Sequence, residues 1–106
     1  MEFETLVNAS KDLLAQMNTE RNRIAPDSIF QVFHTLEKGR KYHRIVSDTM
    51  NTETGKAFDQ RSCAGFIDNE GNVYKSAGWA KPAKTARGNI FQNAKTDGSG
   101  FIRSLR

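Results

Sequence analysis

The first hydrophobic pattern along the chain has the period of an α-helix. Carboxylates stand at its start and arginines at its end, where the helix dipole favours each sign of charge. Pro26 ends the pattern, because a proline excludes helical geometry from the residue before it. The sequence predicts an amphipathic helix over roughly residues 3–23 that packs through one face. Its apolar stripe, at three- and four-residue spacings, consists of Phe3, Leu6, Val7, Leu13, Leu14, Met17 and Ile24.

Beyond Pro26 the pattern changes to short segments of β-type composition separated by polar, glycine-containing turns. The expected strands are 29–36, 41–47, 62–68 and 72–77. The first two form a hairpin around Gly39, and the last two form a second hairpin around residues 69–71. We therefore expect a single α+β domain over residues 1–106, with one long N-terminal helix packed on an antiparallel sheet of about four strands.

Composition limits where the protein is expected to act. The 106 residues suit one domain, and no apolar run approaches the roughly 20 residues that a membrane helix needs. The N-terminus has neither the basic region nor the apolar region of a signal peptide. The single cysteine, Cys63, excludes an internal disulfide and fits a reducing compartment. We expect a cytoplasmic protein without a membrane partner, acting for example in an infected host cell.

Charge is distributed unevenly between the two parts of the chain. Residues 1–70 contain nine Lys/Arg and eleven Asp/Glu, a balance of −2. Residues 71–106 contain seven Lys/Arg against Asp97 alone, a balance of +6. Such asymmetry indicates a face or tail that meets phosphate or carboxylate groups, although a solvated basic tail would show it too.

The sequence shows no signature of catalysis. It lacks a phosphate-binding lysine loop, a dinucleotide fingerprint, a nucleophile elbow and a zinc-protease motif. If the loop 37–40 closes the first hairpin in simple register, His34 lies opposite His43 on the same face. Zinc needs three or four ligands, and Cys63 on another strand is the remaining candidate. We expect a non-enzymatic protein without metal or cofactor, in which the histidines form a polar cross-strand pair.

The segment from Val73 to Phe91 is the candidate binding region, because every charge in it is positive. Trp79 offers an aromatic face, and Lys84 and Arg87 would lie on one side of a helical turn that Gly88 ends. The amide of Asn89 both donates and accepts, as recognition of a base or ribose requires. An aromatic ring, a guanidinium and an amide together are typical of nucleotide binding. The alternative is that Trp79 closes the core while the cations face water.

Two other functions stay open from the residues alone. In the first, a nucleic-acid-binding accessory protein contacts phosphates through cations of the same region, namely Lys75, Lys81, Lys84 and Arg87. In the second, the helix and the basic face dock on a host protein. The length of the helix also leaves apolar surface for a homo-oligomer, a dimer or larger.

Two stretches resemble a known family. GRKYHRIV (39–46) and FIDNEGNVYKSAGWAKPAKTARGNIF (66–91) look like small uncharacterised proteins encoded by tailed phages and common in marine cyanophages. The shared features are a strand ending in Phe-x-Asp, a glycine-containing turn, Val/Ile-Tyr-Lys, Ser-x-Trp and Pro-Ala-Lys-x-x-Arg-Gly-Asn. The resemblance implies a phage-type protein.

More loosely, the layout is similar to phage anti-Thoeris proteins, which sequester cyclic ADP-ribose-type immune signals without cleaving them. That likeness implies an anti-defence binding protein with its ligand held between subunits of an oligomer. Trp79, Arg87 and Asn89 would then line the pocket, and Arg103 or Arg106 would close over it. The expected ligand is a small anionic nucleotide-like molecule.

Overall fold

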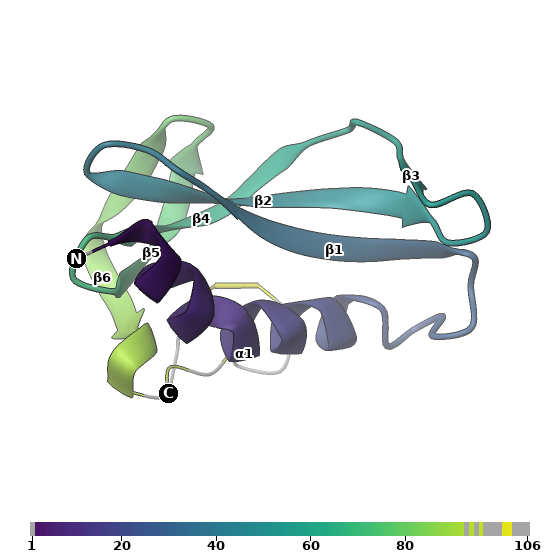
Figure 1. Ribbon diagram of the computed structural model, residues 1–106, viewed down its shortest axis with the longest axis horizontal. Coiled ribbons are helices and arrows are strands. Elements are labelled where there is room, and N and C mark those ends of the chain that lie inside the picture. The colour runs from purple at the N-terminus through teal and green to yellow at the C-terminus, as the bar shows by residue number, and fades with distance from the viewer. Residues whose placement is uncertain (1, 93, 95, 97–100, 103–106) are drawn as a thin grey trace.

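A computed structural model, which describes residues 2–92, 94, 96, 101 and 102, shows one helix against an antiparallel sheet (Figure 1). The sheet order is β1-β2-β4-β5-β6, and β3 pairs with β2. This arrangement confirms the α+β fold expected from the sequence. No helix among the described residues is long and apolar enough to cross a membrane. The elements are α1 (Phe3–Arg21), β1 (Phe30–Glu37), β2 (Tyr42–Asn51), β3 (Lys56–Ala57), β4 (Ser62–Asp68), β5 (Asn72–Gly78), β6 (Lys81–Asn89) and the 3₁₀ turn η1 (Ile90–Gln92).

Helix α1 packs on the sheet through a stripe at helical spacing. Leu6, Leu13 and Met17 are buried as the pattern predicts, and Ser10 between them is buried too, with its hydroxyl donating to a backbone carbonyl of its own helix. The helix ends at Arg21, before the predicted position, and Ile24 beyond it is 97% exposed rather than part of the stripe. The stripe therefore stops where the helix stops.

Asn22 explains where the helix ends. Its side-chain amide donates to the carbonyl of Val32 at 2.8 Å, and its Oδ1 accepts from the Val32 N–H at 2.8 Å. The amide thus pairs with β1 as the backbone of a neighbouring strand does. This pair of bonds joins the end of α1 to the sheet edge and redirects the chain before Pro26 is reached.

The core lies between α1 and one face of the sheet. Ile45, Ile67 and Val73 supply the sheet side and are fully buried. Ile90 of η1 and Ile102 near the C-terminus complete the cluster, and the segment that contains Ile102 lies between α1 and the sheet (Figure 1). Gly65 makes this possible, since a Cβ there would lie 2.5 Å from Cδ1 of Ile102. Ile102 is therefore an integral part of the core.

The register of the first hairpin differs from the prediction. His34 pairs with Ser47, and Glu37 with Arg44, so His34 and His43 are not opposite each other. The turn is wider than expected because the backbone folds back within it. The N–H of Gly39 donates to Nδ1 of His43 at 3.1 Å. His43 then donates from Nε2 to Asn69 in the next turn at 2.7 Å. His43 is thus a structural link between two turns.

A carboxylate organises the turn between β4 and β5. Asp68 accepts hydrogen bonds from the backbone of Glu70 and Asn72, each at 2.9 Å, and from the Tyr74 hydroxyl at 3.0 Å. Burial opposes its ionisation, but these hydrogen bonds prevail and hold the pKa of Asp68 below its usual value. Burial and the same carboxylate raise the pKa of Tyr74 to about 12. The predicted turn at residues 69–71 is therefore rigidly defined.

The segment expected to form a helical turn ending at Gly88 is instead part of the edge strand β6. Residues 84–87 form no helical turn, and Gly88 is absent from the positive-φ residues found in the described chain. Alanine, lysine and arginine favour helix, but pairing with β5 overrides that preference. Pro82 is tolerated because an edge strand needs no donor on its free side. The ladder with β5 is irregular, with register shifts at three places.

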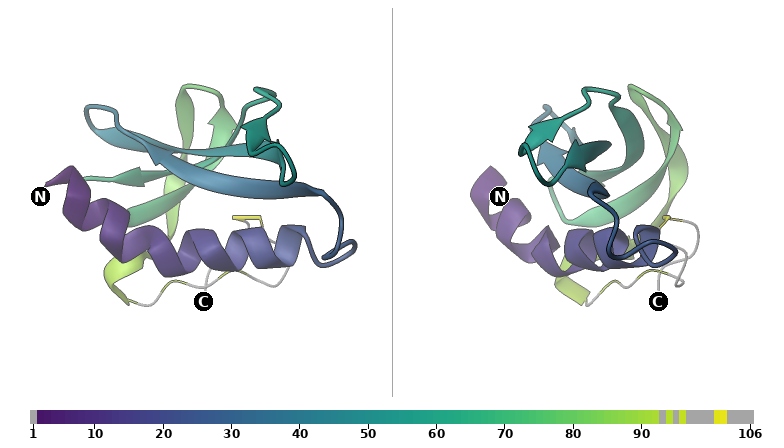
Figure 2. Two further views of the ribbon diagram at one scale, coloured as in Figure 1. Left: turned by 45° about the vertical axis from the view of Figure 1, so that its right-hand side comes forward. Right: turned by 90° about the vertical axis from the view of Figure 1, so that its right-hand side faces the viewer.

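The sheet is strongly curved. Figure 2 shows the β5–β6 hairpin bending round toward the side of the sheet that faces away from α1. The backbone carbonyl of Trp79, at the tip of this hairpin, accepts from Nε of Arg44 on β2 at 2.7 Å. This bond joins the hairpin tip to a strand two positions away in the sheet. The curvature therefore gives the sheet a helix-facing side and a sheltered opposite side.

Gly71 offers a test of the β4–β5 turn. It has φ +87°, and a Cβ there would lie 2.6 Å from the ring of Phe91, so we expect Gly71→Ala to lower the free energy of unfolding by about 3 kcal/mol. Gly55→Ala is the matched control, because Gly55 has φ +71° but nothing within 4 Å of the added Cβ, and should cost only about 1 kcal/mol. Urea denaturation of both variants measures the difference. Equal losses would show that the contact with Phe91 is unimportant.

Candidate functional site

A pocket of about 360 Å³ opens between the end of α1 and strands β2, β4 and β5. Ser47 shows on which side of the sheet the pocket lies. The cross-strand neighbour of Ser47 is His34, and His34 bonds to Asn18 of α1. The pocket is therefore on the helix-facing side, next to the core. Its described lining consists of Arg21, Ser47, Ser62, Cys63, Ala64, Lys75, Ser76, Phe101 and Ile102.

The chemistry of this lining suits an anion. Arg21 and Lys75 bring positive charge from α1 and β5, and serines come from β2 and β4. The hydroxyl of a third serine, Ser76 of β5, bonds to the backbone of Gly78. The described residues of the lining include no carboxylate. Guanidinium, ammonium and hydroxyl groups are the side chains that bind phosphate and carboxylate through charge-assisted hydrogen bonds.

The walls of the pocket hold its cation in place. The guanidinium of Arg21 lies 4.3 Å from the ring centroid of Phe101, a cation–π contact. Ile102 is 3% exposed and packs over Gly65. Because Phe101 adjoins Ile102, which is held by the core, its contact orients Arg21 before any ligand arrives. Such preorganisation reduces the entropy lost on binding.

A buried histidine lies next to the pocket. Nδ1 of His34 donates to Oδ1 of Asn18 at 2.6 Å, which leaves Nε2 as an acceptor without a hydrogen-bond partner among the described residues. Burial, together with the smaller effect of the nearby positive charge of Arg21, lowers the pKa of His34 to about 4. His34 is therefore neutral at pH 7.

The residues predicted to form the binding site are not gathered into one place. Trp79 lies at the turn where Gly78 pairs with Lys81, whereas Asn89 pairs with Asn72 at the other end of the same hairpin. The Asn89 amide bridges backbone and side chain there. It donates to the Glu70 carbonyl at 3.1 Å and accepts from the Phe91 N–H at 2.8 Å.

The predicted cations are also distributed over different surfaces. Lys75 lines the pocket, while Lys81, Lys84 and Arg87 lie along the edge strand β6. Arg87 occupies a register shift between the pairs Val73–Gly88 and Tyr74–Ala86. Arg103 and Arg106 lie outside the described residues. Of the sequence-predicted residues, Lys75 is the one that the pocket includes.

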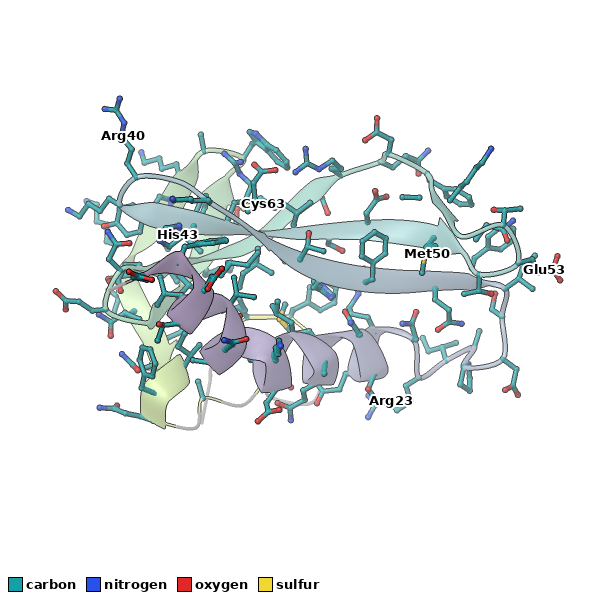
Figure 3. All side chains as sticks on the ribbon, in the orientation of Figure 1. Arg23, Arg40, His43, Met50, Glu53 and Cys63 are labelled. Atoms are coloured by element: carbon teal, nitrogen blue, oxygen red, sulfur yellow. The ribbon has the colours of Figure 1, made fainter. Side chains whose placement is uncertain are left out.

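A wider hollow of about 720 Å³ lies at one end of the sheet, between the first turn of α1 and the β1–β2 turn. Figure 3 shows His43 beside the start of α1, and Arg40 projecting away from the helix. His43 is 2% exposed, with both ring nitrogens hydrogen-bonded. The lining of this hollow has mixed charge: it includes the carboxylates of Glu2 and Glu4 and the cations Lys38 and Arg40. Among described residues, no group of three His, Cys, Asp or Glu suits a metal ion.

Sequence reasoning missed most of the pocket because its parts are distant along the chain. Arg21 is one of the arginines that complement the helix dipole, and Ser47 and Ser62 simply fall within the predicted strands 41–47 and 62–68. The register Ser47–Ser62 brings the two hydroxyls together. Polar side chains on the helix-facing side of a strand, where apolar ones are expected, were the available signal.

Comparison with known proteins gives one match. A family model described as "Family of unknown function (DUF7717)" matches residues 3–102. Neither the curated proteins nor the solved structures include a match to this chain.

The buried His34 should make the stability of the folded protein depend on pH. Because its pKa is about 4 in the folded protein and about 6.5 in the unfolded chain, the folded state is favoured above pH 6.5 and loses stability as pH falls to 4. The loss is at most about 3 kcal/mol. His34→Asn keeps an N–H near the position of Nδ1 and does not titrate, so it should flatten this part of the profile in denaturant titrations.

The carboxylates give an internal comparison for this experiment. The pKa values of Glu37 and Asp68 are lowered in the folded state, by the hydrogen bond from Arg61 and by the turn hydrogen bonds respectively. Their contributions disappear only as pH falls below about 4. An unchanged slope between pH 6.5 and 4 in His34→Asn would contradict the assignment to His34.

Proposed function

The chain belongs to the family of unknown function DUF7717, and we propose that it is a non-catalytic protein that binds a small anionic, nucleotide-like ligand. The ligand occupies the helix-facing pocket. One observation supports this proposal above the others: the described lining combines Arg21, Lys75 and serine hydroxyls without a carboxylate. The proposed binding site is thus this pocket and not the 79–91 segment that the sequence suggested.

The pocket suits a phosphate group attached to a small organic part. Its volume of about 360 Å³ is at the lower end of the range for ligand pockets, which run from about 300 to 1,000 Å³. Arg21 and Lys75 bind the phosphate oxygens, and Ser47 and Ser62 offer hydroxyls to the phosphate or to a sugar. Ala64 and Ile102 supply an apolar wall for the rest of the ligand.

The resemblance to tailed-phage proteins determines which nucleotides are tested first. In its anti-defence form, the proposal is that the protein sequesters a cyclic ADP-ribose-like signal in the cytoplasm of an infected cell. A dimer or larger homo-oligomer belongs to this form, since a second subunit would cover the part of the ligand that extends beyond the pocket. Light scattering with and without ligand measures this state.

Thermal melts test the binding site. A ligand at 100 times its dissociation constant adds about 2.7 kcal/mol, which corresponds to a midpoint shift of about 10–20 °C for a domain of this size. We expect such a shift with a member of a panel of inorganic phosphate, AMP, ADP-ribose and cyclic ADP-ribose. Arg21→Gln and Lys75→Gln each remove a charge-assisted hydrogen bond, so affinity should fall about tenfold to a hundredfold.

Two further variants separate the alternatives. Lys11→Gln removes an exposed positive charge from α1 outside the pocket and should bind as the wild type does. Lys84→Gln tests the site first suggested by the sequence. Loss of binding in Lys84→Gln together with full binding in Arg21→Gln and Lys75→Gln would overturn the assignment to the pocket, and no shift with any panel member would overturn the proposed function.

Cys63 provides a second, independent test because it is a thiol in the pocket lining. We expect the ligand that shifts the melt to slow alkylation of Cys63 by iodoacetamide, by a factor that follows occupancy. Mass spectrometry of the intact chain measures this rate, since the chain contains no second cysteine. In Lys75→Gln, protection should require proportionally more ligand. Alkylation at the same rate with and without saturating ligand would place the ligand elsewhere.

A further inference from the structure

The side of the sheet that faces away from α1 has a second organised cluster. One row of cross-strand neighbours runs through all the paired strands of the main sheet, in the order Glu37, Arg44, Phe66, Tyr74, Ala86. Glu37 and Arg44 form an ion pair at 2.5 Å, and Arg61 pairs with the other oxygen of the same carboxylate. This row does not touch the pocket, which lies on the opposite side of the sheet.

Aromatic rings form the floor of this cluster. Phe66 is 3% exposed although α1 does not cover it. Tyr42 lies edge-on to both Phe66 and Tyr74, with ring centroids 6.4 Å and 5.4 Å apart. Such edge-to-face pairs hold the rings in fixed orientations.

Trp79 lies above this floor and reaches solvent. Its backbone carbonyl is held by Arg44, and the Arg44 guanidinium lies 4.2 Å from its ring centroid. Arg61 approaches the same indole at 5.4 Å. Trp79 is nevertheless 45% exposed. A large aromatic ring that is fixed by its neighbours and remains open to solvent is suited to stacking.

Two guanidiniums contact the exposed indole, and two further cations lie in the β1–β2 turn. Arg44 and Arg61 contact the indole, Lys41 lies 5.6 Å from the Tyr42 ring, and Arg40 projects from the adjacent turn away from α1 (Figure 3). Glu37 balances one of these charges and at the same time fixes both arginines in position. The hydrogen bond from Arg61, with further contributions from both guanidiniums, lowers the pKa of Glu37, so this network stays ionised at neutral pH.

We propose that this helix-free face binds single-stranded nucleic acid, with a base stacked on Trp79 and phosphates bound by Arg61 and Lys41. The combination of an exposed aromatic platform and a surrounding belt of cations is what single-strand binding requires. A duplex fits less well, because its bases are already stacked and cannot reach a single indole in a sheet. The surface is chemically distinct from the pocket and does not depend on the proposed function.

Trp79 is the chain's one tryptophan, so its fluorescence reports on this face directly. The probe is a short oligothymidylate titrated into the full chain. We expect quenching that saturates, and an affinity that falls with salt by about 0.7 logarithmic units per decade for each phosphate contacted. A duplex of the same length should bind more weakly. Absence of quenching, or equal affinity for the duplex, would overturn the proposal.

Variants are compared by anisotropy of a dye-labelled oligothymidylate. Trp79→Ala should weaken binding about tenfold or more, whereas Trp79→Phe retains a stacking ring and should lose less. Arg61→Gln should reduce the salt slope by about 0.7, and the matched control Lys11→Gln on α1 should leave it unchanged. Circular dichroism checks that each variant is folded.

Two outcomes of the variant series would reject the assignment. If Trp79→Ala and Trp79→Phe bind as the wild type does, Trp79 serves packing alone. If Arg61→Gln and Lys11→Gln lower the salt slope equally, the attraction belongs to net charge rather than to this face. Arg21→Gln and Lys75→Gln should bind the oligonucleotide normally, so failure of the pocket and failure of this face are separate results.

Discussion

A single helix has to cover the apolar side of a much wider sheet, and most of the structure follows from this mismatch. Five strands in order span roughly 19 Å, whereas one helix with its side chains is about 10 Å wide. Alpha1 therefore covers only part of that side, and Ile90 and Ile102 from the end of the chain complete the cover. What stays uncovered has to be polar, and it is there that Ser47, Ser62 and Lys75 lie.

The two sides of the sheet solve the same problem differently. On the helix-facing side, cations surround a hollow that is walled by the C-terminal residues. On the other side, curvature brings the β5–β6 hairpin over Phe66, so that Trp79 and Arg44 replace the missing second layer. Both surfaces are positive, but one is concave and rich in hydroxyls while the other is aromatic. Small anions and stacked bases are accordingly the ligands that we propose for the two sides.

Local pattern was sufficient for the helix and for most of the strands. The stripe Leu6, Leu13, Met17 and the alternation around Ile45 and Ile67 express burial on one face, which is a property of the sequence itself. The register of the first hairpin was wrong because it depends on how Gly39 folds back onto His43, a contact that no period encodes. The prediction for β6 was wrong for a related reason. Pairing with β5, rather than the composition of β6 itself, determines the conformation of this segment.

Prediction of the site failed for the same physical reason. Arg21 and Lys75 are far apart in sequence and line one pocket because of where α1 ends, a position that the bonds between Asn22 and Val32 of β1 help to hold. The basic 79–91 segment does contain the exposed Trp79, but Asn89 lies at the other end of a strand from it. Residues about ten positions apart can lie close together in a loop. At the two ends of an extended strand they lie far apart.

The irregular edge strand has a consequence for assembly. Pro82 lacks a donor, the register of β6 shifts repeatedly, and Lys81 and Lys84 place like charges along its length. Each feature opposes the addition of an identical strand, since two copies of β6 would offer incomplete ladders and repelling side chains. The sheet is thus closed to growth at this edge. Strand-by-strand growth into a fibre is therefore opposed at the β6 edge.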